Sequence, residues 1–160
     1  MTAPQFIHLR LHSEFSIADG LVRIDDVVKA AAKDGQPALA ITDLANLFGM
    51  VKFYKAARGK GIKPVIGVDA WITNDDNRDK PSRLLLLAKN RMGYLQLCEL
   101  LSNAWLTNQH KGRAEIRPEW LALGEEPMRP DPTLRDFYAL PPAKQQTIAS
   151  VIRDMTSHYG

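Results

Sequence analysis

Apolar and polar residues follow one another along this chain in a pattern that predicts regular secondary structure. Alternating or continuous apolar runs predict strands over residues 5–12, 37–42, 62–72 and 83–90. Apolar residues at helical spacing predict helices over residues 22–35, 46–58 and 91–108. The polar stretch between the third and fourth strands predicts a turn, and residues 108–113 predict an exposed loop.

The succession of these segments predicts an α/β fold. Strands that alternate with helices form a parallel sheet with right-handed crossovers. In such sheets the functional residues gather at the carboxyl ends of the strands. His12, Asp43 and Asp69 each lie at or near the end of a predicted strand. We therefore expect these three side chains to converge on one pocket.

The character of the chain changes after residue 126. The segment PMRPDPTL over 127–134 is rich in proline and predicts a linker. A helical tail over 135–160 is predicted from apolar residues at helical spacing, namely Ile148, Val151, Ile152 and Met155. The sequence therefore divides into a partial domain over 1–126, a linker and a tail.

Composition excludes several classes of protein. Apolar residues make up 45% of the chain and charged residues 24%, as in folded globular proteins. No apolar run is long enough to cross a membrane, and the first residues lack an apolar targeting core, so we expect a cytoplasmic protein. The net charge of +3 permits contact with nucleic acid without arguing for it.

Three stretches carry a resemblance to a known family. FIHLRLHSEFSIADG, PALAITDLANLFGMVKFYKAARGKGIKPVIGVDAWI and LLLLAKNRMGYLQLCELLSNA are similar to the start of bacterial DNA polymerase III alpha subunits. That region of the family is the polymerase and histidinol phosphatase (PHP) domain. The resemblance covers roughly residues 5–125, and it implies the first half of a distorted (β/α) barrel of the PHP type.

The resemblance also implies a metal site that has lost ligands. In metal-bearing members the first strand ends in His-x-His followed by an acidic residue, the second ends in Thr-Asp-His and the third in glutamate. The matching positions in this chain are Arg10, His12, Asp19, Asp43, Leu44 and Asp69. Leucine donates nothing to a metal, arginine repels it, and aspartate is shorter than glutamate. The resemblance thus implies a vestigial site without a required cofactor, or with residual Mn, Zn or Mg binding.

The charge of Arg10 suggests what takes the place of a metal ion. A guanidinium group is permanently positive and attracts carboxylates. We therefore expect Arg10 to form an ion pair with Asp19 or Asp69.

Simpler interpretations of the other candidates remain open. His8 and His12 could be hydrogen-bonded strand histidines, although His8 is an additional candidate ligand. Asp43 could cap the helix predicted over 46–58, and Asp19 could belong to a turn.

A basic segment over residues 52–63 is a candidate for phosphate contact. Its five cations are Lys52, Lys55, Arg58, Lys60 and Lys63. The alternative is a solvated helix face with a basic carboxyl end.

The resemblance implies the N-terminal PHP region of a replicative DNA polymerase III alpha subunit. In the branch that has lost its PHP metals, this region is a scaffold and a docking surface for a separate proofreading exonuclease subunit. The partners implied are that subunit and the rest of the polymerase, with DNA contacted only in the full-length context. The full-length subunit is a DNA-directed DNA polymerase, a nucleotidyltransferase, but its palm aspartates lie far downstream. We therefore expect a truncated or hybrid chain that is inactive alone.

Two alternatives belong to other functional classes. The first is a metal-dependent phosphoesterase of the PHP superfamily that uses the two histidines near the N-terminus and the three aspartates of the proposed site. The second is a small interaction protein that has borrowed half of a PHP domain and works through its tail.

Overall fold

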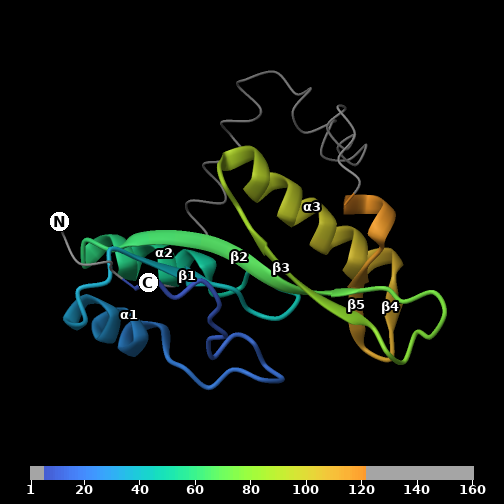
Figure 1. Cartoon of the computed structure of the whole chain (residues 1–160), viewed down its shortest axis with the longest axis horizontal. Helices are drawn as coiled ribbons and strands as arrows, with labels where there is room; N and C mark the ends of the chain where they lie inside the picture. Colours follow the sequence, from blue (N-terminus) through green and yellow to red (C-terminus); the bar gives the residue numbers. More distant parts are fainter. Residues whose placement is uncertain (1–5, 122–160) are drawn as a thin grey trace, which may run out of the picture. The chain divides into compact units, whose positions relative to one another are not determined.

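A computed structural model describes residues 6–121 of the chain, shown in Figure 1. The helices are α1 (Ile24–Lys33), α2 (Met50–Gly59), α3 (Arg91–Thr107) and the short 3-10 helix η1 (Pro118–Leu121). The strands are β1 (Ala38–Ile41), β2 (Lys63–Ile72), β3 (Ser82–Leu87), β4 (Gln109–His110) and β5 (Arg113–Ile116). The predicted linker over 127–134 and tail over 135–160 lie outside the described residues.

The strands form a mixed sheet around β2. β1 pairs with the first half of β2 in parallel, with Ala38 opposite Lys63. β5 pairs in parallel with its end, at Trp71 and Ile72, whereas β3 pairs with it antiparallel. β4 and β5 form a short antiparallel pair. The predicted α/β class is therefore confirmed, with parallel strands at the centre of the sheet.

α1 and α2 pack against β1 through apolar residues that lie on one face of each helix. Ile24 and Val28 lie one turn apart on α1, and both are buried. They belong to one core cluster with Phe53 of α2 and with Leu39 and Ile41 of β1. This core joins β1 to α1 and α2, and Ile66 in the first half of β2 packs against it. None of the helices within residues 6–121 is long and apolar enough to cross a membrane.

Part of the sequence-based prediction of the elements was wrong. The segment 5–12 forms no regular strand over its described residues, although His8 makes a parallel bridge to Leu39 of β1. The main-chain N–H of Leu11 donates instead to the hydroxyl oxygen of Thr42, at 2.8 Å. A side chain thus accepts the hydrogen bond that a backbone carbonyl would accept in a ladder. The loop predicted over 108–113 contains β4 and the start of β5.

The helix predicted over 46–58 begins later, at Met50. Ala45 has a positive φ of 52°, which is incompatible with a right-handed helix. The side-chain amide of Asn46 donates to the carbonyl oxygens of Phe15 and Leu44, at 3.1 and 3.0 Å. These contacts fix residues 43–49 as a loop between β1 and α2.

Candidate functional site

Asp69 is the centre of a compact group of charged side chains. It lies in the middle of β2 and is buried, with 1% of its surface exposed. The Nε and Nη2 atoms of Arg10 lie 2.9 and 2.5 Å from Asp69 Oδ2. Arg83 donates from Nε to Asp69 Oδ1 at 3.0 Å, and its Nη2 lies 2.8 Å from Oδ2. Both carboxylate oxygens of Asp69 are therefore bound by guanidinium groups.

His12 connects Asp69 to a second carboxylate. Its Nε2 lies 3.1 Å from Asp69 Oδ2 and its Nδ1 lies 2.9 Å from Asp19 Oδ1. Asp19 also accepts a hydrogen bond of 2.7 Å from the hydroxyl of Ser16. Its backbone N–H donates to the carbonyl of Ser16, so Asp19 belongs to a turn as well as to this group. We call Arg10, His12, Asp19, Asp69 and Arg83 the charged cluster.

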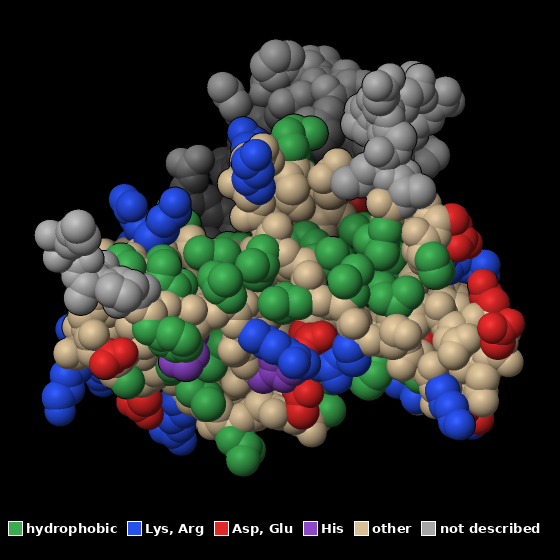
Figure 2. All heavy atoms as spheres, viewed as in Figure 1, with side chains coloured by type: hydrophobic (Ala, Val, Ile, Leu, Met, Phe, Trp, Pro, Cys, Tyr) green, Lys and Arg blue, Asp and Glu red, His purple; other side chains and the backbone are tan. Residues whose placement is uncertain are grey.

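The charged cluster extends from the buried Asp69 to the surface of the molecule. Figure 2 shows basic, acidic and histidine side chains together near the middle of the face in view. Arg10 is the outermost member, since 60% of its side chain is exposed, against 28% for Arg83. The arrangement has two guanidinium groups for two carboxylates.

Asp43 is bound separately from the charged cluster. Its carboxylate accepts hydrogen bonds from the backbone N–H of Ser13 at 2.5 Å and from the Ser13 hydroxyl at 2.8 Å. The expectation that Asp43 caps the following helix was wrong, because the residue that precedes α2 is Gly49. Of the three residues expected to converge, His12 and Asp69 contact each other, and Asp43 holds the Ser13 backbone beside them.

The two buried aspartates respond to their surroundings in opposite ways. Burial raises the pKa of Asp69, but the hydrogen bonds and charges of Arg83 and Arg10 outweigh it, so this pKa lies below its ordinary value. Burial also raises the pKa of Asp43, and there the two hydrogen bonds from Ser13 do not compensate. The two guanidinium groups thus lower the pKa of Asp69, whereas burial leaves the pKa of Asp43 above its ordinary value.

Arg83 is a member of the charged cluster that the sequence analysis missed. It is the second residue of the apolar strand β3, where it lies directly opposite Trp71 in the antiparallel register. Its guanidinium carbon lies 4.4 Å from the centroid of the Trp71 ring, a cation–π contact that helps to orient it. The polar turn between two apolar strands indicated a β-hairpin. A hairpin would have placed Arg83 beside the end of β2.

The remaining candidates for metal ligands lie elsewhere. Leu44, which the resemblance matched to a histidine position, forms a parallel bridge with Asp69 and also lines an apolar groove described below. His8 is exposed, and its ring packs edge-on against Phe6 with centroids 4.6 Å apart. The side chain of His8 therefore contacts Phe6 and not a member of the charged cluster.

The residues of the charged cluster do not fit a divalent cation. Within residues 6–121, no three or more His, Cys, Asp and Glu side chains are placed to hold a metal ion. The carboxylate that would be the natural ligand, Asp69, is already neutralised by Arg10 and Arg83. A metal ion there would have to displace two positive groups that repel it.

One cation of the basic segment over 52–63 is held in ion pairs, and the other four differ from it. Lys52 lies 2.8 Å from Glu14 and 3.8 Å from Asp25, so it is unsuited to the predicted phosphate contact. The other members are exposed and have no ion pair within the part of the chain that the structure describes: Lys55, Arg58, Lys60 and Lys63. Phosphate contact by these four residues stays a prediction.

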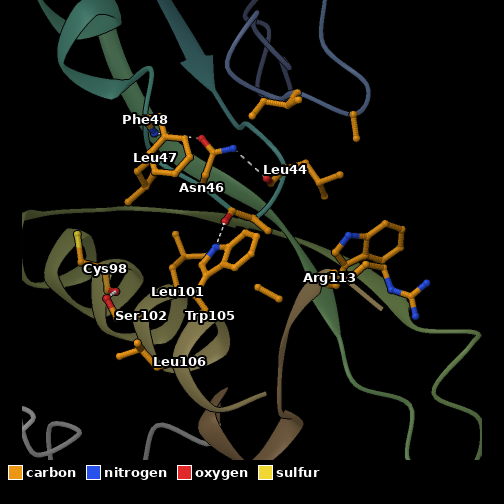
Figure 3. A pocket seen from close by; sticks show the side chains of 16 residues that line it. Leu44, Asn46, Leu47, Phe48, Cys98, Leu101, Ser102, Trp105, Leu106 and Arg113 are labelled. Carbon is orange, nitrogen blue, oxygen red and sulfur yellow. Dashed lines mark hydrogen bonds between the residues drawn. The ribbon is translucent and has the colours of Figure 1, made fainter. Parts of the chain in front are cut away.

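Figure 3 shows an apolar groove. It adjoins the charged cluster, because Trp71 lines the groove and contacts Arg83. Its volume is about 990 Å³. Leu101 and Trp105 of α3 face Leu47 and Phe48 of the loop before α2. The indole Nε1 of Trp105 donates to the carbonyl of Ala45 at 2.8 Å, which fastens α3 to this loop. We call this hollow the apolar groove; the tip of the loop over 13–20 also lines it.

Gly20→Ala tests whether the turn that carries Asp19 depends on close backbone packing. A Cβ atom at Gly20 would lie 1.9 Å from the carbonyl oxygen of Ser13, so the backbone must move. We expect a loss of about 2 kcal/mol in the free energy of unfolding, measured by urea denaturation. Gly59→Ala is the matched control, because nothing lies within 4 Å of a Cβ there. Equal stability of the two variants would contradict this account of the turn.

Comparisons with known proteins place this geometry in context. A family model described as "PHP domain" matches residues 8–129. The chain is 51% identical over 126 residues to DNA polymerase III subunit alpha of Neisseria meningitidis, which covers 78% of this chain and 11% of that protein. It is 47% identical over 121 residues to the same subunit of Pseudomonas aeruginosa, covering 76% and 10%. The chain thus spans about a tenth of the length of these curated relatives.

Solved structures of similar shape are more distant. An amidohydrolase from Chromobacterium violaceum superposes with a TM-score of 0.45 at 22% identity, covering 61% of this chain and 34% of that one. A putative metal-dependent phosphoesterase from Bifidobacterium adolescentis superposes with a TM-score of 0.42 at 18% identity, covering 62% and 33%.

Proposed function

This chain belongs to the PHP domain family, and on that basis we propose that it works as the N-terminal PHP region of a DNA polymerase III alpha subunit. Its role there is structural: it is a scaffold and a docking surface for the proofreading exonuclease subunit of a cytoplasmic replicative polymerase. The DNA-directed DNA polymerase activity belongs to the longer subunit. The relatives named above support the assignment to this subunit, because the identity extends over three quarters of the chain.

The observation that carries the structural role is the ion pairing of Asp69. A hydrolytic metal site needs several free electron-pair donors around the ion. Here Arg10 and Arg83 bind both oxygens of that carboxylate. We propose that this arrangement is a degenerate metal site, in which guanidinium groups supply the positive charge that a metal ion once supplied.

Restoring the lost ligands tests the degenerate site. We expect Arg10→His with Leu44→His to create zinc binding that is measurable by isothermal titration calorimetry, because it adds two imidazoles and removes one repelling charge. Addition of Arg83→Gln should tighten binding further, since it frees Asp69. Arg117→His with Leu106→His is a control that makes the same residue changes at exposed positions. Equal zinc affinity of the restored and control variants would refute the mapping of ligand positions.

The apolar groove supports the docking role. Phe48 and Leu106, which line the groove, are 69% and 77% exposed, and Ile17 is 87% exposed. Contiguous exposed apolar residues of this kind mark surfaces that bind other proteins. We therefore propose that the exonuclease subunit binds at this groove.

A binding measurement with the purified exonuclease subunit tests this placement. We expect Phe48→Asp to weaken binding at least about tenfold, measured by biolayer interferometry, because the change puts a charge into an apolar contact. Leu21→Asp is the matched control, since Leu21 is 95% exposed and does not line the groove. Unchanged binding by Phe48→Asp would move the docking surface elsewhere on the domain.

The phosphoesterase alternative has less support from the geometry. Its ligands would be His8, His12, Asp19, Asp43 and Asp69. Two guanidinium groups bind the carboxylate of Asp69. The test is hydrolysis of p-nitrophenyl phosphate with added manganese. Activity that disappears in His12→Ala would favour the phosphoesterase over the structural role.

A further inference from the structure

A second hollow lies between α2 and the beginning of α3, with a volume of about 460 Å³. Tyr54 of α2 and Tyr94 of α3 line it, together with Pro64, Lys89 and Arg91. The volume is within the range of pockets that hold a small organic group. We call it the tyrosine hollow.

Positively charged side chains surround the tyrosine hollow. Lys89 and Arg91 are exposed, and no carboxylate belongs to the lining. Lys55 and Lys63, which adjoin the lining residues Tyr54 and Pro64 in the sequence, are exposed as well. None of these four cations forms an ion pair with another of the residues 6–121. Their charges therefore add to a local positive potential that attracts polyanions.

Aromatic surface lies within this ring of cations. Tyr54 is 49% exposed, which leaves part of its ring open to a ligand. Burial, and after it the hydrogen bond with Cys98, raises the pKa of Tyr94 to about 12, so its hydroxyl is neutral and repels no phosphate. In Figure 2, basic side chains lie at the start of α3.

Aromatic rings among unpaired cations suit one class of ligand. Single-stranded nucleic acids present bases that stack on aromatic faces and phosphates that bind Lys and Arg. An acidic peptide would use the cations but not the rings, and it does not explain why both tyrosines line one hollow. We propose that the tyrosine hollow binds a single-stranded nucleic acid, with a base against Tyr54 and Tyr94 and phosphates at Lys89 and Arg91. This site lies outside the charged cluster and goes beyond the docking role.

Fluorescence anisotropy of a labelled oligothymidylate with the full chain tests the proposal. We expect binding that weakens as salt rises, because phosphate contacts release counterions. Lys89→Glu with Arg91→Glu should weaken binding by at least about tenfold at constant salt. Tyr54→Ala should weaken it about fivefold or more, whereas Tyr54→Phe, which keeps the ring, should bind like the wild type.

A charge-matched variant on α1 provides the control. Lys29→Glu with Lys33→Glu makes the same change in net charge at exposed positions away from the tyrosine hollow. An equal loss of binding in this variant would overturn the proposal, because net charge alone would then explain the binding. Failure of the wild type to bind oligothymidylate at low salt would overturn it too. Equally tight binding of poly-glutamate to the same site would assign the hollow to acidic peptides instead. Circular dichroism of each variant verifies that the fold is intact.

Discussion

Asp69→Asn is expected to lower the free energy of unfolding by about 3 kcal/mol, because it removes the buried partner of charged groups. The asparagine side chain keeps the size of aspartate but carries no charge to compensate Arg10 and Arg83. Most of the cost arises at Arg83, which is left without its counterion in a more buried position. Its side chain is 28% exposed, against 60% for Arg10. Urea denaturation monitored by tryptophan fluorescence measures the change.

The control for this prediction is an exposed aspartate. Asp26 on α1 lies 4.0 Å from Lys29, and both side chains are mostly exposed. Asp26→Asn should therefore change stability by less than about 1 kcal/mol. If Asp69→Asn were as mild as Asp26→Asn, the charged cluster would contribute little to the fold, and its part in a scaffold would have to be abandoned.

The same interactions determine how the free energy of unfolding changes at low pH. The pKa of Asp69 is lowered in the folded protein, so its contribution is fully present above the unfolded value of 3.8 and is lost as pH falls through the folded value. Asp43 has a raised pKa and acts in the opposite direction: its contribution is present at low pH and is lost as pH rises. Asp69→Asn should therefore flatten the loss of stability below about pH 4, as measured by urea denaturation at several pH values.

Glu115→Gln is the second substitution with a large expected effect, a loss of about 3 kcal/mol in the free energy of unfolding. The Glu115 side chain is fully buried, and its oxygens lie 3.0 Å from Arg78 Nη2 and 3.3 Å from Arg113 Nη2. Arg78 comes from the turn between β2 and β3, whereas Arg113 begins β5. The carboxylate thus ties the β2–β3 turn to the strand that lines the apolar groove.

Glu119→Gln is the matched control, because Glu119 is exposed and lies 3.6 Å from Arg117. We expect a change of less than about 1 kcal/mol for it. Hydrogen exchange should show faster opening of β5 in Glu115→Gln than in the control. Equal exchange in the two variants would mean that the fold does not depend on the buried carboxylate.

The charged cluster and the apolar groove share structural supports. Trp71 contacts the guanidinium of Arg83 on the cluster side and also lines the groove. Asp19 belongs to the cluster, and its neighbours Ile17 and Ala18 line the groove. A change that breaks the cluster should therefore also disturb the proposed docking surface, even when the groove residues are untouched.

Several features of the fold followed from the sequence alone. The strand predicted over 62–72 is observed as β2 and the helix predicted over 91–108 as α3, each within one residue at either end. These elements are long and their apolar periodicity is a local property, so it can be identified without knowing what each face packs against. The motifs of the first half of the chain likewise identified the family, because they lie in order along the sequence.

Other features depended on contacts between distant residues. The start of α2 was mislocated because Ala45 and Asn46 adopt a loop held by Phe15, about thirty positions earlier. Asp43 looked like a helix cap, but its carboxylate binds Ser13 across the fold. Such hydrogen bonds override the local preference for a helix, and no pattern within one segment records them.

The sequence by itself therefore determined the α/β class and the family, and it predicted that Arg10 would pair with a carboxylate. Only the tertiary structure decided how the charged cluster is completed. The antiparallel register of β2 and β3 places Arg83 beside Asp69, where it joins Arg10. A strand pairing is fixed by the whole sheet and not by either strand, so a residue fourteen positions away became the second counterion of a buried carboxylate.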